Sequence, residues 1–266
     1  MKRWKSGLLM AHTLAVLAFL YIPMAAIAVY SFNDSRLNAI WQGFTFRWYV
    51  SLFRNEYLME ALFNSLLIAA VSTVVSTLLG TLTALAMRRV SRWKGLAETL
   101  LYMPILIPEI VMGLSLLVLF THLLIPLGKM TILIAHITFS LSYVYVIVAA
   151  RLEGLNPHLE EAAQDLGADP WHTFRHVTLP LIMPGIVAGA LISFTLSIDD
   201  FMVSFFVAGP GSTTLPIYIY GQVKRGISPE INALATIMIV LTVVLVVAAE
   251  RFRRQDGGKT ADRSLF

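Results

Sequence analysis

Long uninterrupted runs of apolar residues constrain this chain more than any other feature. A helix needs about 20 apolar residues to cross about 30 Å of hydrocarbon, and the runs between the charged clusters reach that length. The chain is 57% hydrophobic and 14% charged, with a mean hydropathy of +0.74, which lies outside the range of soluble domains. We therefore expect an all-α polytopic membrane protein with a single transmembrane domain over residues 1–266. The six expected spans are Leu8–Ser31, Ala61–Met87, Leu96–Leu124, Thr131–Ala150, Leu181–Val207 and Ile231–Ala249.

The distribution of basic residues predicts how these spans are oriented. If the N-terminus is cytoplasmic, fourteen of the 20 Lys and Arg residues fall on the cytoplasmic side. The positive-inside rule then places both termini in the cytoplasm. The first span follows Lys2, Arg3 and Lys5 as a signal peptide would, but it is long and no clear small-residue cleavage site follows it. We expect it to be retained as a helix.

Motifs for catalysis, metal binding and nucleotide binding are missing from the sequence. There is no cysteine, no GxxxxGK[ST] phosphate loop and no HExxH zinc motif. No nucleophile elbow occurs, and the six histidines are scattered without a site-like spacing. The basic residues also lack the clustering on one face that nucleic-acid binding needs. We expect no catalytic residue, no metal, no nucleic-acid partner and no cofactor bound by this chain.

Small residues recur at four-residue intervals in two of the expected spans. The second span carries Ser72, Ser76, Gly80 and Ala84, and the fifth contains the GxxxG stretch Gly185–Gly189. Such stripes let helices approach closely in lipid. GxxxG is common in apolar helices, so an interface and ordinary packing both remain open for that stretch.

The polar segment at about residues 156–178 predicts a helical hairpin on the cytoplasmic face. Asn156 and Pro157 are a typical N-cap and first helical residue. Gly167 is a natural stop because it tolerates the left-handed conformation, and Asp169–Pro170 predicts a second helix to about Val177. The first helix carries an apolar stripe at helical spacing, opposite a polar face. Its members are Leu159, Ala162, Ala163 and Leu166.

The stretch "EAAQDLGADPWHTFRHVTLP", Glu161 to Pro180, resembles the EAA loop of ABC-importer permeases. The spacing of Glu-Ala-Ala, Gly and Leu-Pro matches, with Val177 where Ile is more usual. The resemblance implies a type I (MetI-like) permease fold and a hairpin that docks into a separate ATP-binding subunit. The docking residues that it implies are Glu161, Ala162, Ala163, Gly167 and Trp171. It further implies two ATP-binding subunits that bind ATP and Mg, a second homologous permease, a periplasmic binding protein and a place in the bacterial inner membrane.

The resemblance extends along nearly the whole chain to one kind of permease. "YIPMAAIAVYSFNDS", "PEIVMGLSLLVLF", "SFTLSIDDFMVSFFVAGP" and "SPEINALATI" occur in the same order as in the second permease of spermidine and putrescine importers, the PotC/PotI type. This implies that the cargo is a polyamine. Related opine, iron and sulfate permeases share the loop and part of the outline, so another small solute stays open as the cargo.

Acidic residues inside the spans are where a cationic cargo would be expected to bind. An ionised carboxylate near the bilayer centre costs on the order of 3 kcal/mol, so it should face a bundle interior or water. Glu109 lies thirteen residues beyond Leu96, roughly 20 Å along a straight helix. Pro104 and Pro108 flank it, and each removes a helical hydrogen bond. A structural partner for Glu109 is harder to find, because its span has no nearby Lys or Arg.

Asp199 and Asp200, near the outer end of the fifth span, form either an electronegative entrance or a helix end exposed to water. Trp41, Tyr143 and Tyr145 are candidate cation-stacking residues, with membrane packing as the alternative. A competing hypothesis is a secondary transporter that is coupled to ions through these same carboxylates. The hairpin and the missing inverted repeat favour the ATP-driven importer over it.

Overall fold

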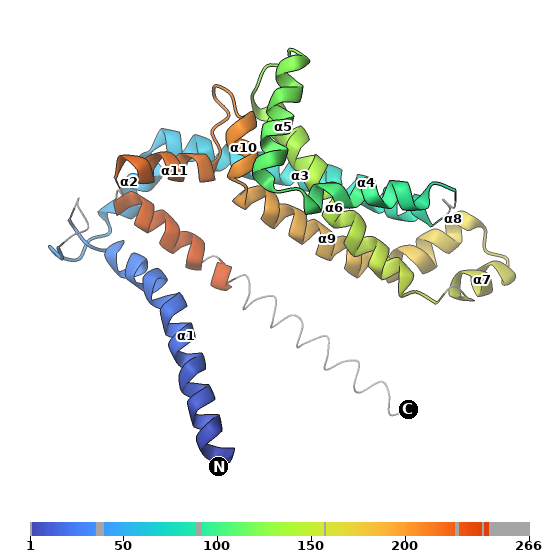
Figure 1. Ribbon diagram of the computed structural model, residues 1–266, viewed down its shortest axis with the longest axis horizontal. Helices are drawn as coiled ribbons and strands as arrows, with labels where there is room; N and C mark the ends of the chain where they lie inside the picture. Colours follow the sequence, from blue (N-terminus) through green and yellow to red (C-terminus); the bar gives the residue numbers. More distant parts are fainter. Residues whose placement is uncertain are drawn as a thin grey trace. The chain divides into compact units, whose positions relative to one another are not determined.

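The computed structural model describes residues 2–35, 40–88, 92–156, 158–226, 229–240 and 242–244. Pro157 and the predicted last span beyond residue 244 lie outside these ranges. The described residues are largely helical (Figure 1), and their only extended pairing is an isolated antiparallel bridge between Asn33 and Phe44. The predicted all-α class is confirmed. The chain forms two compact units, Met1–Glu56 with Ile219–Phe266 and Tyr57–Tyr218.

The first unit contains helices α1 (Lys2–Tyr30) and α2 (Arg47–Arg54). No residue in the most apolar window of α1 is buried. The segment between the two helices is folded back by Trp48, whose indole Nε1 donates to the Asn33 carbonyl at 2.7 Å. Ser51, on α2, donates to the Glu230 carboxylate. Helix α2 is therefore anchored at both of these side chains.

The second unit is built on three long helices, α3 (Glu56–Met87), α6 (Lys129–Glu153) and α9 (Leu179–Asp199). The predicted small-residue stripe of α3 is buried against its neighbours. Its contacts are Ser72 with Ser197 (3.0 Å between hydroxyl oxygens), Ser76 with Ser193 (2.8 Å) and Gly80 with Val144. A Cβ on Gly80 would lie 2.8 Å from Val144 Cβ, so only glycine permits this approach.

The GxxxG stretch marks the contact between α6 and α9, which lie side by side in Figure 1. A Cβ on Gly185 would lie 3.0 Å from Arg151 Cβ, and one on Gly189 would lie 3.3 Å from Val144 Cγ1. The stretch is thus a helix–helix contact within this chain. Val144 lies between Gly80 and Gly189, which brings three helices together at one buried residue.

The predicted third span, Leu96–Leu124, is broken, and the straight-helix geometry expected around Glu109 is wrong. Helix α4 (Lys94–Leu106) and helix α5 (Glu109–His122) meet at a bend of 107°. Pro108 is the physical reason, because a proline disfavours the helical conformation at the preceding residue and donates no hydrogen bond. Ile107 accordingly has an extended ψ of 130°. Glu109 lies in the first turn of a new helix.

The predicted fifth span, Leu181–Val207, is also broken. Helix α9 ends at Asp199, Asp200 is extended, and the short helix α10 (Met202–Val207) follows. The other end of α9 continues from the hairpin through α8 (Pro170–Thr173) and the π-helical turn η1 (Phe174–Thr178). The second hairpin helix therefore does not end at Val177 as predicted. The wider π-turn precedes Pro180, which lies in the first turn of α9, where its missing N–H is least costly.

Two further helical segments complete the described chain. Helix α11 (Leu215–Arg225) follows a loop held on α3, where the Ser65 hydroxyl accepts a hydrogen bond from the Leu215 amide at 2.7 Å. Residues 229–240 and 242–244 are also helical. Within the described residues, four helices are long and apolar enough to cross a membrane, or five if the bent α4–α5 pair counts as one. The count of six spans stays a prediction.

Candidate functional site

The two helix breaks face one cavity of about 390 Å³. Its lining comes from α4, α5, α6, α9 and α10, which are far apart in sequence. Four of the predicted path residues are among the lining residues: Glu109, Tyr143, Asp199 and Asp200. The structure therefore brings together carboxylates from two spans that the sequence alone could only name separately.

The helix ends around the cavity have a charge arrangement that suits a cation. Helix α4 ends at Leu106 and α9 ends at Asp199, so the partly negative C-terminal ends of both helices border the cavity. Glu109 lies in the first turn of α5, the end of a helix that favours a carboxylate. Discontinuous helices use their C-terminal ends and freed carbonyls in this way at cation sites of membrane transporters.

Asp199 and Asp200 have different environments despite being adjacent. The Asp199 carboxylate is exposed, as is that of Glu109, and neither forms a hydrogen bond or ion pair within the described residues. The Asp200 side chain is 5% exposed and accepts from the backbone amides of Val203 (3.2 Å) and Ser204 (2.7 Å) at the start of α10. Two free carboxylates, rather than three, remain available in this cavity.

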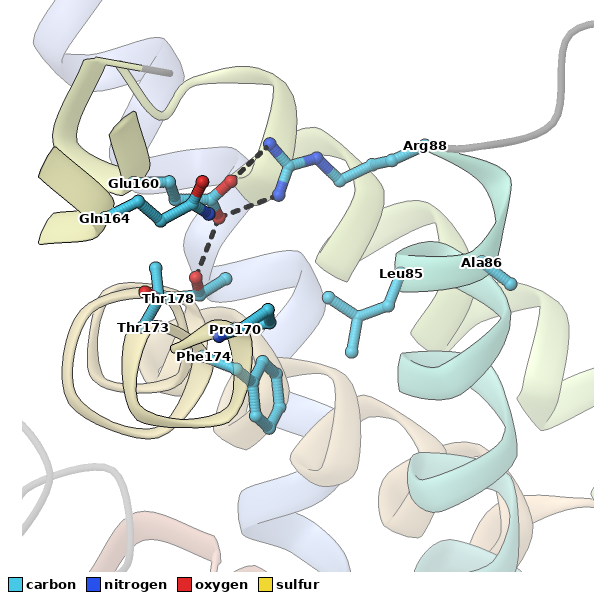
Figure 2. Close-up of a pocket in the computed structure, with 9 residues that line it drawn as sticks. All are labelled: Leu85, Ala86, Arg88, Glu160, Gln164, Pro170, Thr173, Phe174 and Thr178. Carbon is cyan, nitrogen blue, oxygen red and sulfur yellow. Dashed lines mark hydrogen bonds and ion pairs between the residues drawn. The ribbon is translucent and has the colours of Figure 1, made fainter. Parts of the chain in front are cut away.

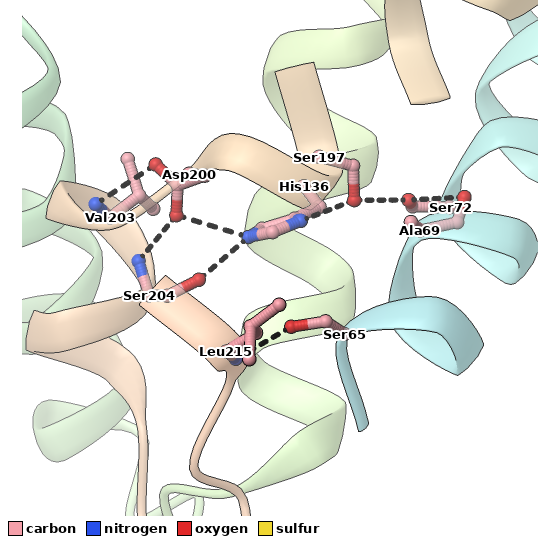
Figure 3. A network of polar contacts seen from close by, with 9 residues as sticks. All are labelled: Ser65, Ala69, Ser72, His136, Ser197, Asp200, Val203, Ser204 and Leu215. Atoms are coloured by element: carbon pink, nitrogen blue, oxygen red, sulfur yellow. Dashed lines mark hydrogen bonds and ion pairs between the residues drawn. The ribbon is translucent and has the colours of Figure 1, made fainter. Parts of the chain in front are cut away.

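His136 holds the third carboxylate and was missed in the sequence (Figure 3). Its Nε2 lies 3.2 Å from Asp200 Oδ2 and 2.9 Å from Ser204 Oγ, and its Nδ1 lies 2.7 Å from Ser197 Oγ. Ser197 in turn contacts the Ser72 hydroxyl on α3. The signal that points to it is a polar, ionisable residue inside an apolar run, which is a functional candidate by default. Spacing rules for metal and catalytic sites do not detect it.

Two predicted stacking residues do not line this cavity. Trp41 belongs to the first unit and is 50% exposed. Tyr145 is buried and packs edge-on against Tyr102 at a centroid distance of 6.1 Å. It lines a separate cavity of about 100 Å³ with Glu98 and Glu153. Of the three candidate aromatic residues, Tyr143 alone borders the cavity between the helix breaks.

The hairpin forms from the local signals that predicted it. The Asn156 side chain accepts from the His158 amide at 3.1 Å before helix α7 (His158–Asp165). Gly167 has φ +90°, a left-handed value that glycine adopts without strain. The Asp169 side chain caps α8 by accepting from the His172 amide at 2.8 Å. This hydrogen bond lowers the pKa of the Asp169 carboxyl below its ordinary value.

An amphipathic helix usually buries its apolar side, but the apolar stripe predicted in the first hairpin helix is largely exposed. Leu166 is 90% exposed and Trp171, on α8, is 63% exposed. The docking candidates Glu161, Ala162 and Gly167 are exposed too, while Ala163 is partly buried. Glu161 Oε2 lies 2.9 Å from His158 Nδ1. The hairpin thus presents apolar side chains outward on a polar segment, which is typical of a surface that a partner covers.

A polar face of α7 points toward the end of α3 (Figure 2). The Glu160 carboxylate pairs with both terminal nitrogens of the Arg88 guanidinium, at 2.9 and 3.2 Å, and accepts from the Thr178 hydroxyl at 2.7 Å. These side chains border a cavity of about 740 Å³ together with Gln164 and Phe174. We call Arg88, Glu160 and Thr178 the hairpin clamp. It joins α3, α7 and η1 through one carboxylate.

A family model places the chain among known transport proteins. The model for the binding-protein-dependent transport system inner membrane component matches residues 76–255. The chain belongs to this family. It is therefore an inner membrane component of a transport system, and the fold described above is that of an ABC-importer permease.

Curated relatives and a solved structure agree with this family. The chain is 47% identical over 250 residues to the spermidine/putrescine transport system permease protein PotC of Escherichia coli (strain K12). The aligned region covers 93% of this chain and 95% of PotC. It is 44% identical over 230 residues to the putrescine transport system permease protein PotI of the same strain, covering 83% and 82%. A bacterial ABC transporter that imports the acidic polysaccharide alginate has the same fold, with a TM-score of 0.71 at 22% identity, over 96% of this chain and 99% of that one.

Proposed function

We propose that this chain is a permease subunit of an ATP-driven importer that moves polyamines, spermidine or putrescine, across the bacterial inner membrane by alternating access. The observation that carries the proposal is the cavity between the two helix breaks, bordered by the free carboxylates of Glu109 and Asp199. The polyamine cargo of the relatives PotC and PotI supports the same choice.

The chemistry of the cargo matches this cavity. A polyamine carries two or more ammonium groups, and a bare charge in hydrocarbon is costly, so its path needs carboxylates, carbonyls or aromatic faces. Glu109, Asp199 and Tyr143 supply two of these three groups as side chains. The alginate transporter carries an acidic cargo on the same fold. The fold therefore does not set the cargo, which in this proposal is selected by the side chains at the cavity and by the binding protein.

The partners in this proposal are two ATP-binding subunits, a second homologous permease and a periplasmic binding protein. The exposed apolar hairpin face around Leu166 and Trp171 suits docking into an ATP-binding subunit, with Glu161, Ala162, Ala163 and Gly167 at the contact. The ATP-binding subunits hold ATP and Mg. Both termini lie in the cytoplasm, and the exposed Glu109 and Asp199 face the second permease, which completes the path.

Reconstitution of the complete complex in liposomes tests the proposal. Loaded binding protein outside and ATP at the ATP-binding subunits should drive accumulation of labelled putrescine or spermidine, and a non-hydrolysable ATP analogue should stop it. Uptake of an opine or an iron chelate instead, with no amine uptake, would assign the same machine to another cargo. Vectorial transport by this chain alone, without ATP-binding subunits, would refute the ATP-driven mechanism.

A further inference from the structure

His136 connects four structural elements through one buried ring. It lies on α6, it is 1% exposed, and both ring nitrogens are within hydrogen-bond distance of partners. Nδ1 contacts Ser197 on α9, and Nε2 contacts Asp200 at the break and Ser204 on α10. Figure 3 shows the chain of contacts continuing from Ser197 to Ser72 on α3. Buried polar networks of this kind are costly unless every member is satisfied.

The contacts define the role of each ring nitrogen. A carboxylate only accepts hydrogen bonds, so Nε2 carries a hydrogen, which it shares between Asp200 Oδ2 at 3.2 Å and Ser204 Oγ at 2.9 Å. In the neutral ring Nδ1 is then an acceptor, which suits donation from the Ser197 hydroxyl. A glutamine amide offers the same pair of roles, one donor and one acceptor, without a titratable group. Leucine fills a similar volume and offers neither.

The position of Asp200 affects the positions of both carboxylates proposed to bind the cargo, Glu109 and Asp199. It is adjacent to Asp199, and its own carboxylate caps α10 through the amides of Val203 and Ser204. Helix α10 contacts α5 at backbone distance, since a Cβ on Gly113 would lie 3.2 Å from Val203 Cα. Glu109 begins α5. A shift of the α9–α10 break would therefore move both Asp199 and Glu109.

We infer that His136 is a positioning residue for translocation: it locks Asp200 as the cap of α10 and so sets the geometry of the Glu109 and Asp199 carboxylates, without touching the cargo. His136 is not among the residues that line the cavity. Asp200 borders the cavity, but its carboxylate is already hydrogen-bonded to His136 and to the first turn of α10. The inference rests on the proposed function, because it assigns roles at the cavity through which the cargo passes.

The test compares four variants in the reconstituted complex: His136→Gln, His136→Leu, Asp200→Asn and the double variant His136→Leu with Asp200→Asn. The quantity measured is the number of labelled amines transported per ATP hydrolysed. A variant that merely lowers the amount of assembled complex reduces transport and hydrolysis together and leaves this ratio unchanged. The matched control is His122→Gln, an exposed histidine in the last turn of α5, which should keep the wild-type ratio.

A positioning role predicts a specific pattern. His136→Leu should lower the ratio on the order of tenfold, as expected when a buried charge-assisted hydrogen bond is lost, and His136→Gln should stay within about threefold of wild type. The double variant should cost less than the sum of the two single variants, because both changes act on the same His136–Asp200 contact. A glutamine variant as impaired as leucine, or additive losses in the double variant, would overturn the inference.

A second readout does not depend on the cargo. In the complex labelled with ¹⁵N-histidine, the resonances absent from the His136→Gln variant belong to His136. Asp200→Asn should shift them, because it replaces the charged carboxylate beside the Nε2 proton with a neutral amide. Unshifted resonances would refute the hydrogen bond between His136 and Asp200, even if the transport ratios change. If the wild-type complex transports no amine, the proposed function fails, and this spectrum still decides whether His136 holds Asp200.

Discussion

The hairpin and the cavity are assembled in opposite ways. In the hairpin the stabilising contacts join near neighbours: Asn156 with His158, and Asp169 with His172. In the cavity Glu109 and Asp199 come from different spans and are brought together by packing of α5 against α10. The hairpin is also exposed, whereas the Asp200–His136 pair beside the cavity is buried. The comparison teaches that the proposed docking element is encoded locally and the proposed cargo path is encoded by tertiary contacts.

Disrupting the hairpin at its turn should have the largest effect. Gly167→Arg places a side chain at φ +90°, a conformation that costs about 1–2 kcal/mol for residues other than glycine, and adds bulk on the proposed docking face. We expect loss of uptake and of the ATP hydrolysis that loaded binding protein stimulates. Gly167→Ala is the control, since it carries the strain without the bulk. Normal stimulated hydrolysis in Gly167→Arg would remove Gly167 from the docking surface.

Changing the cavity should have the next largest effect and should spare the hairpin. Glu109→Gln removes one free carboxylate and keeps the side-chain shape, so uptake of a di- or trivalent amine should fall by about tenfold or more, the loss expected for one charge-assisted contact. Complex assembly should stay intact. Glu98→Gln is a matched control, because Glu98 lines the separate cavity beside Tyr145. Unchanged uptake kinetics for Glu109→Gln would exclude this residue from the path.

The hairpin clamp should give a smaller effect, and it tests how the two regions communicate. Arg88→Gln leaves Glu160 with Thr178 but removes the two-point ion pair. The pair is partly exposed, at 36% and 27% of the two side chains, so its contribution is screened by solvent and should be about 1 kcal/mol or less. We expect a few-fold fall in amines transported per ATP. The control is Lys94→Gln, which breaks the exposed Lys94–Glu98 pair and should leave the ratio unchanged.

The smallest effect should come from the cap of α8. The pKa of the Asp169 carboxyl is lowered mainly by the hydrogen bond from the His172 amide. Its contribution to hairpin stability is therefore present above the ordinary pKa of the carboxyl and is lost as the pH falls through the lowered value. Asp169→Ala should speed hydrogen exchange at the amides of residues 172 and 173 at neutral pH, whereas Asp169→Asn should preserve most of the protection. Equal exchange in both variants would contradict the cap.

The elements that were predicted correctly depend on short-range rules. The apolar runs predicted the membrane helices, and small residues at four-residue spacing in the second span predicted a close helix contact, which the structure places between Gly80 and Val144. The caps at Asn156 and Asp169 and the left-handed Gly167 were predicted because each satisfies a backbone group within a few residues. The same approach missed the continuation of α8 into α9, because it ended the second hairpin helix at about Val177, where the structure has a π-helical turn.

The error in the predicted third span arises at its prolines. Pro104 and Pro108 were recognised as helix-weakening residues, but whether such a span kinks or breaks depends on what packs in the gap. At Pro108 the chain bends by 107°, while Pro104 remains inside α4. Asp199 and Asp200 were predicted as a pair, yet only tertiary contacts with His136 and α10 separate a free carboxylate from a locked one.

The sequence by itself determined the long apolar helices, the hairpin and the family, because apolar length, capping and motif spacing are properties of neighbouring residues. The tertiary structure decided that two broken helices enclose one cavity and that His136 holds Asp200 there. Those features depend on side chains that approach within 3.2 Å across 64 residues of sequence. No local pattern specifies such a pairing, because it arises only when α6, α9 and α10 pack together.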